Sequence, residues 1–106
     1  MDATTKPKSF SEILLTERLV LVDFSAEWCG PCKMMKPVLE ELKSWAGDGV
    51  RILKVDIDKN IHTASQYHVT AVPTFLFFRH GQAVWRHSGA VDLALLKKIV
   101  QENFSP

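Results

Sequence analysis

The feature that most constrains this chain is a short apolar segment, Leu19–Phe24, that leads directly into two cysteines and then a helical pattern. A nearly continuous apolar run of this length is typical of a strand covered on both faces. From Pro31 to Ala46, apolar residues recur every three or four positions, which predicts an amphipathic helix. Pro31 fits the first turn of that helix, where a missing N–H costs nothing. A strand buried on both faces requires helices above and below its sheet.

The other segments alternate between helical and strand patterns. Ser9 to about Arg18 is predicted to form a short helix with Ser9 or Ser11 as its N-cap. Pro37 predicts a bend in the second helix, because it removes a backbone hydrogen bond. Beyond it we predict a strand over 50–55, a helix over 61–67, strands over 74–79 and 83–87, and a helix from Asp92. This order predicts an α/β fold, a three-layer α/β/α sandwich with a mixed central sheet.

Size and composition indicate one domain and exclude two classes of partner. A chain of 106 residues leaves little room for a second domain, so residues 1–106 are predicted to form a single domain. Hydrophobic residues make up 46% of the chain, enough to bury a core without a metal or a structural disulfide. The net charge is +1 with no basic stripe, so neither nucleic acid nor an anionic membrane is an expected partner.

The N-terminal segment, residues 1–8, is polar and is expected to be poorly ordered. It lacks the apolar stretch of a secretory signal, and no later apolar run reaches the length of a transmembrane helix. These features predict a cytoplasmic protein. In that reducing compartment, two cysteines separated by two residues are more often redox-active or metal-binding than a permanent crosslink.

Cys29 and Cys32, the only cysteines, are expected to have different roles at the start of the second helix. Backbone N–H groups and the helix dipole favour an anion at Cys29, so a lowered pKa makes it the predicted nucleophile. Cys32, one turn further, is expected to be more buried and to resolve the mixed disulfide that Cys29 forms with a target. Gly30 and Pro31 are expected to tune the redox potential, since Pro31 fixes φ and removes a donor.

A zinc half-site is the plainer alternative for the cysteine pair. Tetrahedral zinc needs two further ligands, and the chain has no second cysteine pair. His62 with His68, or His80 with His87, fit a solvated helix or hairpin better than a metal site. We therefore predict no metal.

Four motifs resemble those of the thioredoxin family in order and spacing. They are Val22–Phe24, the segment Ala26–Lys33 with its Trp-Cys-Gly-Pro-Cys-Lys hexapeptide, Lys54–Asp56 and Val72–Thr74. A bare pair of cysteines is weak evidence, whereas the full hexapeptide followed by Pro73 about forty residues later is specific. The similarity spans roughly residues 9 to 104 and implies a thioredoxin fold.

The resemblance implies roles for three residues near the cysteines. Asp23 matches the family's buried carboxylate, the proton acceptor for Cys32, and Lys54 matches the partner of that carboxylate. Burial is expected to raise the pKa of Asp23, and Lys54 to oppose that shift. Without the resemblance, Asp23 would be interpreted as a carboxylate at the end of a strand whose hydrogen bonds are all made, and Lys54 as an exposed strand residue. Pro73 matches a cis-proline that faces the disulfide, rather than an ordinary edge-strand proline.

The resemblance also implies a substrate-binding surface around the disulfide. Its predicted residues are Trp28, Val72, Pro73, Thr74 and Gly89. The backbone of Val72 is expected to pair with an extended substrate segment by strand addition, while Gly89 lets the substrate backbone approach closely.

Two features depart from the family pattern. Ser25 stands where most thioredoxins carry a second tryptophan, so substrate preference or local packing is expected to differ. The edge strand that the family places before its first helix is expected to be short or absent, because residues 1–8 offer no strand pattern.

The function implied by the resemblance is that of a protein dithiol–disulfide oxidoreductase. Its redox centre would be the Cys29–Cys32 pair, without a cofactor. The implied partners are disulfide-containing target proteins and a thioredoxin-reductase-like flavoprotein that supplies electrons from NADPH, and the chain is expected to be a monomer. The alternative is a redox-gated binding module or a subunit of a larger complex. An oxidant or isomerase of a secretory compartment is disfavoured by Gly30–Pro31 and by the absent signal.

Overall fold

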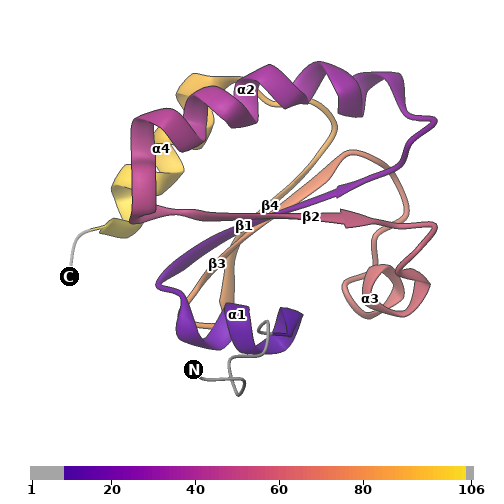
Figure 1. The fold of residues 1–106 in the computed structure, drawn as a ribbon, viewed down its shortest axis with the longest axis horizontal. Coiled ribbons are helices and arrows are strands. Elements are labelled where there is room, and N and C mark those ends of the chain that lie inside the picture. The colour runs from indigo at the N-terminus through magenta and orange to yellow at the C-terminus, as the bar shows by residue number, and fades with distance from the viewer. Residues whose placement is uncertain (1–8, 105–106) are drawn as a thin grey trace, which may run out of the picture.

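The computed structural model describes residues 9–104, and all the predicted helices and strands are present within two residues of their expected ends (Figure 1). In chain order they are α1 (Phe10–Thr16), β1 (Leu19–Ser25), α2 (Gly30–Ala46), the 3-10 turn η1 (Gly47–Gly49), β2 (Arg51–Asp56), α3 (Ile61–Gln66), β3 (Thr74–Arg79), β4 (Gln82–Ser88) and α4 (Leu93–Phe104).

The four strands form one mixed sheet in the order β2-β1-β3-β4. Strand β1 is parallel to β2 and antiparallel to β3, and the β3–β4 hairpin is antiparallel. The β1–β2 register places Asp23 directly opposite Lys54. Among the strands of residues 9–104, β2 is the outermost on its side of the sheet. The predicted loss of an earlier edge strand, and the predicted disorder, concern residues 1–8, which lie outside the described residues.

Both faces of the sheet are covered, because alternate residues of β1 belong to different cores. Leu19 and Leu21 pack with α2 and α4 on one face, whereas Val20, Val22 and Phe24 pack with α1 and the segment after α3 on the other. Figure 1 shows α2 and α4 on one side of the sheet and α1 and α3 on the other. The three-layer sandwich is confirmed, and it explains why β1 is almost continuously apolar.

The site is set by the short connection between β1 and α2. Strand β1 ends at Ser25 in the centre of the sheet, and α2 begins at Gly30 with Cys29 as its N-cap. Pro31 lies in the first turn and Pro37 inside the helix. None of the helices within residues 9–104 is both long and apolar enough to cross a membrane.

Helix α1 is capped by Ser9, and not by Ser11. The backbone N–H of Glu12 donates to Ser9 Oγ at 3.2 Å, and this hydroxyl donates to Glu12 Oε1 at 3.1 Å. We expect Ser9→Ala to lower the free energy of unfolding by about 1 kcal/mol, because it leaves a helix N–H without its cap. Urea unfolding measures this loss. Ser11→Ala, on the exposed side of α1, is the matched control, and an equal loss in both variants would contradict the assignment.

Candidate active site

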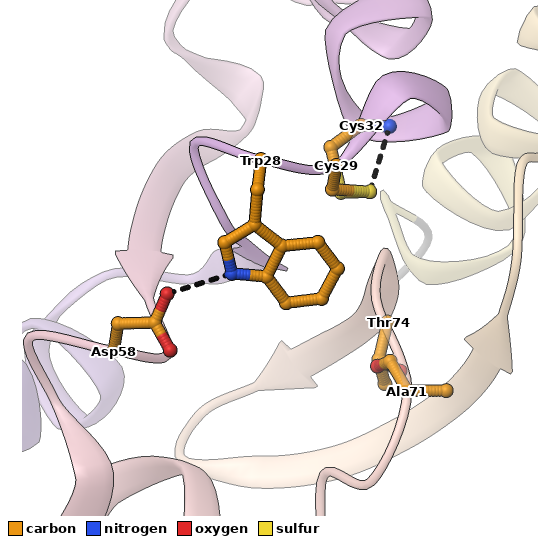
Figure 2. The surroundings of a disulfide bond; sticks show 6 residues. All are labelled: Trp28, Cys29, Cys32, Asp58, Ala71 and Thr74. Atoms are coloured by element: carbon orange, nitrogen blue, oxygen red, sulfur yellow. Dashed lines mark hydrogen bonds between the residues drawn. A yellow bond between two sulfur atoms is a disulfide. The ribbon is translucent and has the colours of Figure 1, made fainter.

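Cys29 and Cys32 form a disulfide across the first turn of α2 (Figure 2), with their Cα atoms 5.3 Å apart. The backbone N–H of Cys32 donates to Cys29 Sγ at 3.2 Å. The Cys29 sulfur therefore takes the position of an N-cap acceptor, where helix N–H groups favour negative charge. In the reduced protein this position favours a thiolate at Cys29.

The burial of the two cysteines differs from the prediction. In this oxidised form Cys29 is 4% exposed and Cys32 is 8% exposed, so the expectation that Cys32 is the more buried of the two is wrong. Both cysteines pack in one small cluster with Ala26, and Ile57 and Val72 lie against that cluster. Burial therefore does not distinguish the two thiols. They differ in position, because Cys29 is the N-cap of α2 and Cys32 lies within its first turn.

Asp23 is a buried carboxyl group that shares a pocket with Cys32. It is 2% exposed, and its Oδ1 atom makes no hydrogen bond with the described residues. Burial raises the pKa of Asp23 to about 6, and Lys54 on the neighbouring strand opposes the shift, as expected. The pocket has a volume of about 230 Å³ and is lined by both Asp23 and Cys32. A carboxyl group that titrates near neutral pH beside a cysteine can accept a proton from its thiol.

The same pocket contains Lys36, which sequence reasoning did not select. Ser25 and Lys36 line it together with Lys54. Lys36 follows Cys32 by four residues, and this helical spacing could have identified it, since side chains four apart share a face. Ser25 is half-buried, and its small side chain forms part of the pocket wall at the position where the family usually has tryptophan.

Trp28 lies on the surface beside the disulfide and is 68% exposed. Figure 2 shows its indole extending toward Asp58, and Nε1 donates to Asp58 Oδ2 at 2.9 Å. A second link, the ion pair between Lys59 and Glu27 at 3.4 Å, joins the same two segments. The loop before Cys29 is thus tied to the turn after β2. Sequence reasoning missed Asp58, because no local pattern indicates a contact between residues 30 positions apart.

The segment before β3 borders the disulfide. The Val72–Pro73 peptide bond is cis, as predicted, and Val72 packs against the cysteine cluster. The carbonyl of Pro73 accepts a hydrogen bond from the N–H of Gly89 at 2.7 Å. Gly89 has φ +99°, in the region that favours glycine. Val72, Pro73 and Gly89 are therefore held together next to the cysteines.

Thr74 is fully buried, and its hydroxyl is used within this segment. Thr74 Oγ1 donates to the carbonyl of Ala71 at 2.6 Å and lies 3.1 Å from Ser88 Oγ. Figure 2 shows Thr74 and Ala71 together on this turn. The side chain of Thr74 therefore shapes the turn that presents Val72 and Pro73.

Gly30 and Pro31 lie exposed between the cysteines. A Cβ atom added at Gly30 would have no neighbour within 4 Å, so packing does not require glycine there. Their influence on the redox potential stays a prediction. In the part of the chain that the structure describes, no three His, Cys, Asp or Glu side chains gather in a way that could hold a metal ion.

Known proteins resemble this chain over most of its length. A family model described as thioredoxin matches residues 2–102. The chain belongs to the thioredoxin family. Thioredoxin from Chlamydia trachomatis is 48% identical over 85 residues, which cover 80% of this chain and 82% of that one. Among solved structures, a mutant thioredoxin from Halobacterium salinarum superposes with a TM-score of 0.82 at 35% identity, covering 91% of this chain and 83% of that one.

One thioredoxin relative is part of a larger protein. The bifunctional thioredoxin reductase/thioredoxin of Mycobacterium leprae is 42% identical over 92 residues, which cover 87% of this chain and 20% of that one. The predicted thioredoxin fold is confirmed by these likenesses. Family membership and the Cys29–Cys32 pair make the chain a protein-disulfide oxidoreductase, as predicted. Thioredoxins use this disulfide as their redox centre and work with a reductase and with disulfide-containing targets.

Proposed function

We propose that this chain reduces target disulfides with Cys29 as the nucleophile. The observation that carries the proposal is the place of Cys29 as the N-cap of α2, with the N–H of Cys32 donating to its sulfur. The Cys29 thiolate attacks one sulfur of the target disulfide, and the other target sulfur leaves as a thiolate. A mixed disulfide between Cys29 and the target results.

The second step uses Cys32 and Asp23. The Asp23 carboxylate takes the proton of the Cys32 thiol through the pocket that both line, whose volume of about 230 Å³ has room for water. The Cys32 thiolate then attacks Cys29 Sγ, and the target sulfur leaves and is protonated. Two electrons pass to the target, and Cys29–Cys32 becomes the disulfide. Lys54 favours the ionised form of Asp23 and so keeps it able to act near neutral pH.

The target is proposed to bind beside Trp28 and the Val72–Pro73 segment. The exposed indole of Trp28 offers apolar surface, and the backbone of Val72 pairs with an extended part of the target. Gly89 leaves room for that approach, since a Cβ there would touch nothing within 4 Å. Thr74 holds the turn, and Gly30 and Pro31 tune the potential.

We propose further that residues 1–106 act as one monomeric domain in the cytoplasm, recharged by a flavoprotein reductase that uses NADPH. The relative from Mycobacterium leprae, whose name combines both activities, supports a reductase as partner. A reducing compartment suits a pair that must return to its dithiol form.

Equilibration with glutathione redox buffers tests the reducing role. We expect a midpoint near ~−270 mV, the value typical of thioredoxins as a family. The fraction of oxidised Cys29–Cys32 is measured by mass spectrometry after alkylation of the free thiols. A midpoint near ~−180 mV or higher would contradict the proposal and favour an oxidant or isomerase.

A further inference from the structure

The turn that joins α3 to the segment beside the disulfide has an unusual backbone. Tyr67 is the C-cap of α3, and His68 follows it with φ +55°. This left-handed conformation is unfavourable for a residue other than glycine, and it persists where the surrounding structure holds it. The N–H of His68 donates to the carbonyl of Ser65 at 3.0 Å, and the N–H of Val69 to the carbonyl of Ala64 at 2.9 Å. These bonds satisfy the N–H groups of the turn, and its carbonyls need other partners.

Arg86 of β4 supplies those partners. Its Nη1 donates to the carbonyl of Tyr67, and its Nη2 donates to the carbonyl of His68 at 2.8 Å. Arg86 lies opposite Leu76 in the β3–β4 hairpin, and Leu76 packs in the core that contains α1 and the segment after α3. A planar guanidinium can hold two carbonyls at once in a fixed geometry, which the single ammonium of lysine cannot do. Its charge also suits the negative end of a helix.

The other end of the same segment is also attached to this strand. We call residues 69–73 the binding segment, because targets are proposed to bind at Val72 and Pro73. The N–H of Gly89, directly after β4, donates to the carbonyl of Pro73 at 2.7 Å. Arg86 holds the turn before the binding segment. The backbone of Val72 therefore lies between two attachments to β4, three positions apart.

We propose that Arg86 is a positioning residue for target binding, which fixes the binding segment by holding the carbonyls of Tyr67 and His68. This inference rests on the proposed binding of targets at that segment. Without the guanidinium, the turn would leave its left-handed conformation more often, and the binding segment would adopt several arrangements. A target that fits one arrangement then binds more weakly, in proportion to the fraction of the protein that adopts it. The chemistry of the cysteine pair does not depend on that fraction.

A direct role of its charge is the alternative for Arg86. Its side chain is exposed, so it could attract an acidic target without holding the turn. Arg86→Lys separates the two roles, because lysine keeps the positive charge and cannot hold both carbonyls in the same way. If Arg86 acts by position, lysine does not replace it.

The experiment compares two substrates of the reduced full-length protein. Insulin presents a disulfide within a polypeptide backbone, whereas hydroxyethyl disulfide has no backbone to pair with Val72. Arg86→Ala and Arg86→Lys are each expected to lower the second-order rate constant with insulin about fivefold, and to leave that with hydroxyethyl disulfide within about twofold. A general loss of folded protein would lower both rate constants equally. Arg51→Lys, at an exposed arginine of β2, is the matched control and is expected to change neither.

Hydrogen exchange shows whether the turn itself is loosened. The amide of Val69, which donates to Ala64 across the turn, is expected to exchange at least about fivefold faster in Arg86→Ala than in the wild type. The same amide in Arg51→Lys is expected to exchange at the wild-type rate.

Three results would overturn the proposal. They are an unchanged ratio of the two rate constants in Arg86→Ala, a wild-type ratio in Arg86→Lys, or unchanged exchange at Val69. Trp28→Ala distinguishes them from a failure of the proposed function, since this exposed residue of the target surface is also expected to lower the rate with insulin. If Trp28→Ala lowers that rate and Arg86→Ala does not, targets bind at the proposed surface without help from Arg86. If neither variant lowers it, the proposed target surface is wrong and the inference about Arg86 is wrong with it.

Discussion

Replacing Cys29 by serine is expected to lower the rate of insulin disulfide reduction to that of the uncatalysed reaction. A serine hydroxyl does not attack a disulfide at neutral pH, so no mixed disulfide forms. Cys32→Ser is expected to behave differently. Its Cys29 still attacks, but without Cys32 the covalent complex with the target persists. Insulin turnover and mass spectrometry of the adduct separate the two steps.

The comparison depends on both variants remaining folded. Cys29 and Cys32 are buried, so each variant is first compared with the reduced wild-type chain by circular dichroism. Cys29→Ser protein that still reduces insulin would refute its role as nucleophile. The variant with serine at both positions addresses the alternative function, because catalysis needs sulfur and docking does not. If it sustained the cellular role of the wild type, the chain would be a binding module.

Most of the fold, and the position of the cysteines between β1 and α2, could be predicted from the sequence. The apolar run of β1 and the helical spacing of α2 predict a buried strand followed by a helix. Cys29 is therefore predicted to lie at the N-terminus of that helix, where the structure has it. Local patterns suffice there, because the periods of strand and helix differ. The partnership of Asp23 with Lys54 came from the family resemblance, since strand register across the sheet is not local. The observed β1–β2 register now places the two residues opposite each other.

Contacts between distant segments could not be predicted. Cys29 and Cys32 are both buried in a cluster against which Val72 packs from the turn before β3, 43 positions after Cys29 in the chain. The hydrogen bond from Trp28 to Asp58 depends on how two loops pack after the sheet has formed. Loops carry weak periodic patterns, so their sequence does not indicate which partners they meet.

Asp23→Asn is expected to stabilise the oxidised protein at neutral pH. Burial raises the pKa of Asp23 from its ordinary 3.8 to about 6, so the folded state disfavours the ionised form. The stability that Asp23 contributes is fully present below the pKa that its carboxyl group has in the unfolded chain. It is lost as the pH rises through the pKa that the group has in the folded protein. At about 1.4 kcal/mol per pKa unit, a rise from 3.8 to about 6 corresponds to a loss of about 3 kcal/mol by pH 7.5.

Urea unfolding at several pH values measures this effect. Asparagine cannot ionise, so the variant is expected to exceed the wild type by up to about 3 kcal/mol at pH 7.5, and the difference is expected to shrink steadily toward pH 4. Asp48→Asn, at an exposed carboxyl group in η1, is the matched control and is expected to show no such pH-dependent gain. A difference for Asp23→Asn that is the same at every pH would show that ionisation is not its cause.

Asp23→Asn is also expected to slow the attack of Cys32 on the mixed disulfide, the step in which the Asp23 carboxylate is proposed to accept a proton. Without a proton acceptor for Cys32, resolution of the mixed disulfide is expected to fall about 100-fold at pH 7, and the dependence of its rate on a group with pKa about 6 to disappear. Stopped-flow measurement of target release reports this step, whereas the first attack by Cys29 should change little. Unchanged resolution rates between pH 5 and pH 8 would remove Asp23 from the mechanism. Greater stability together with slower resolution would show that the chain keeps an unfavourable buried charge because the chemistry of Cys32 requires it.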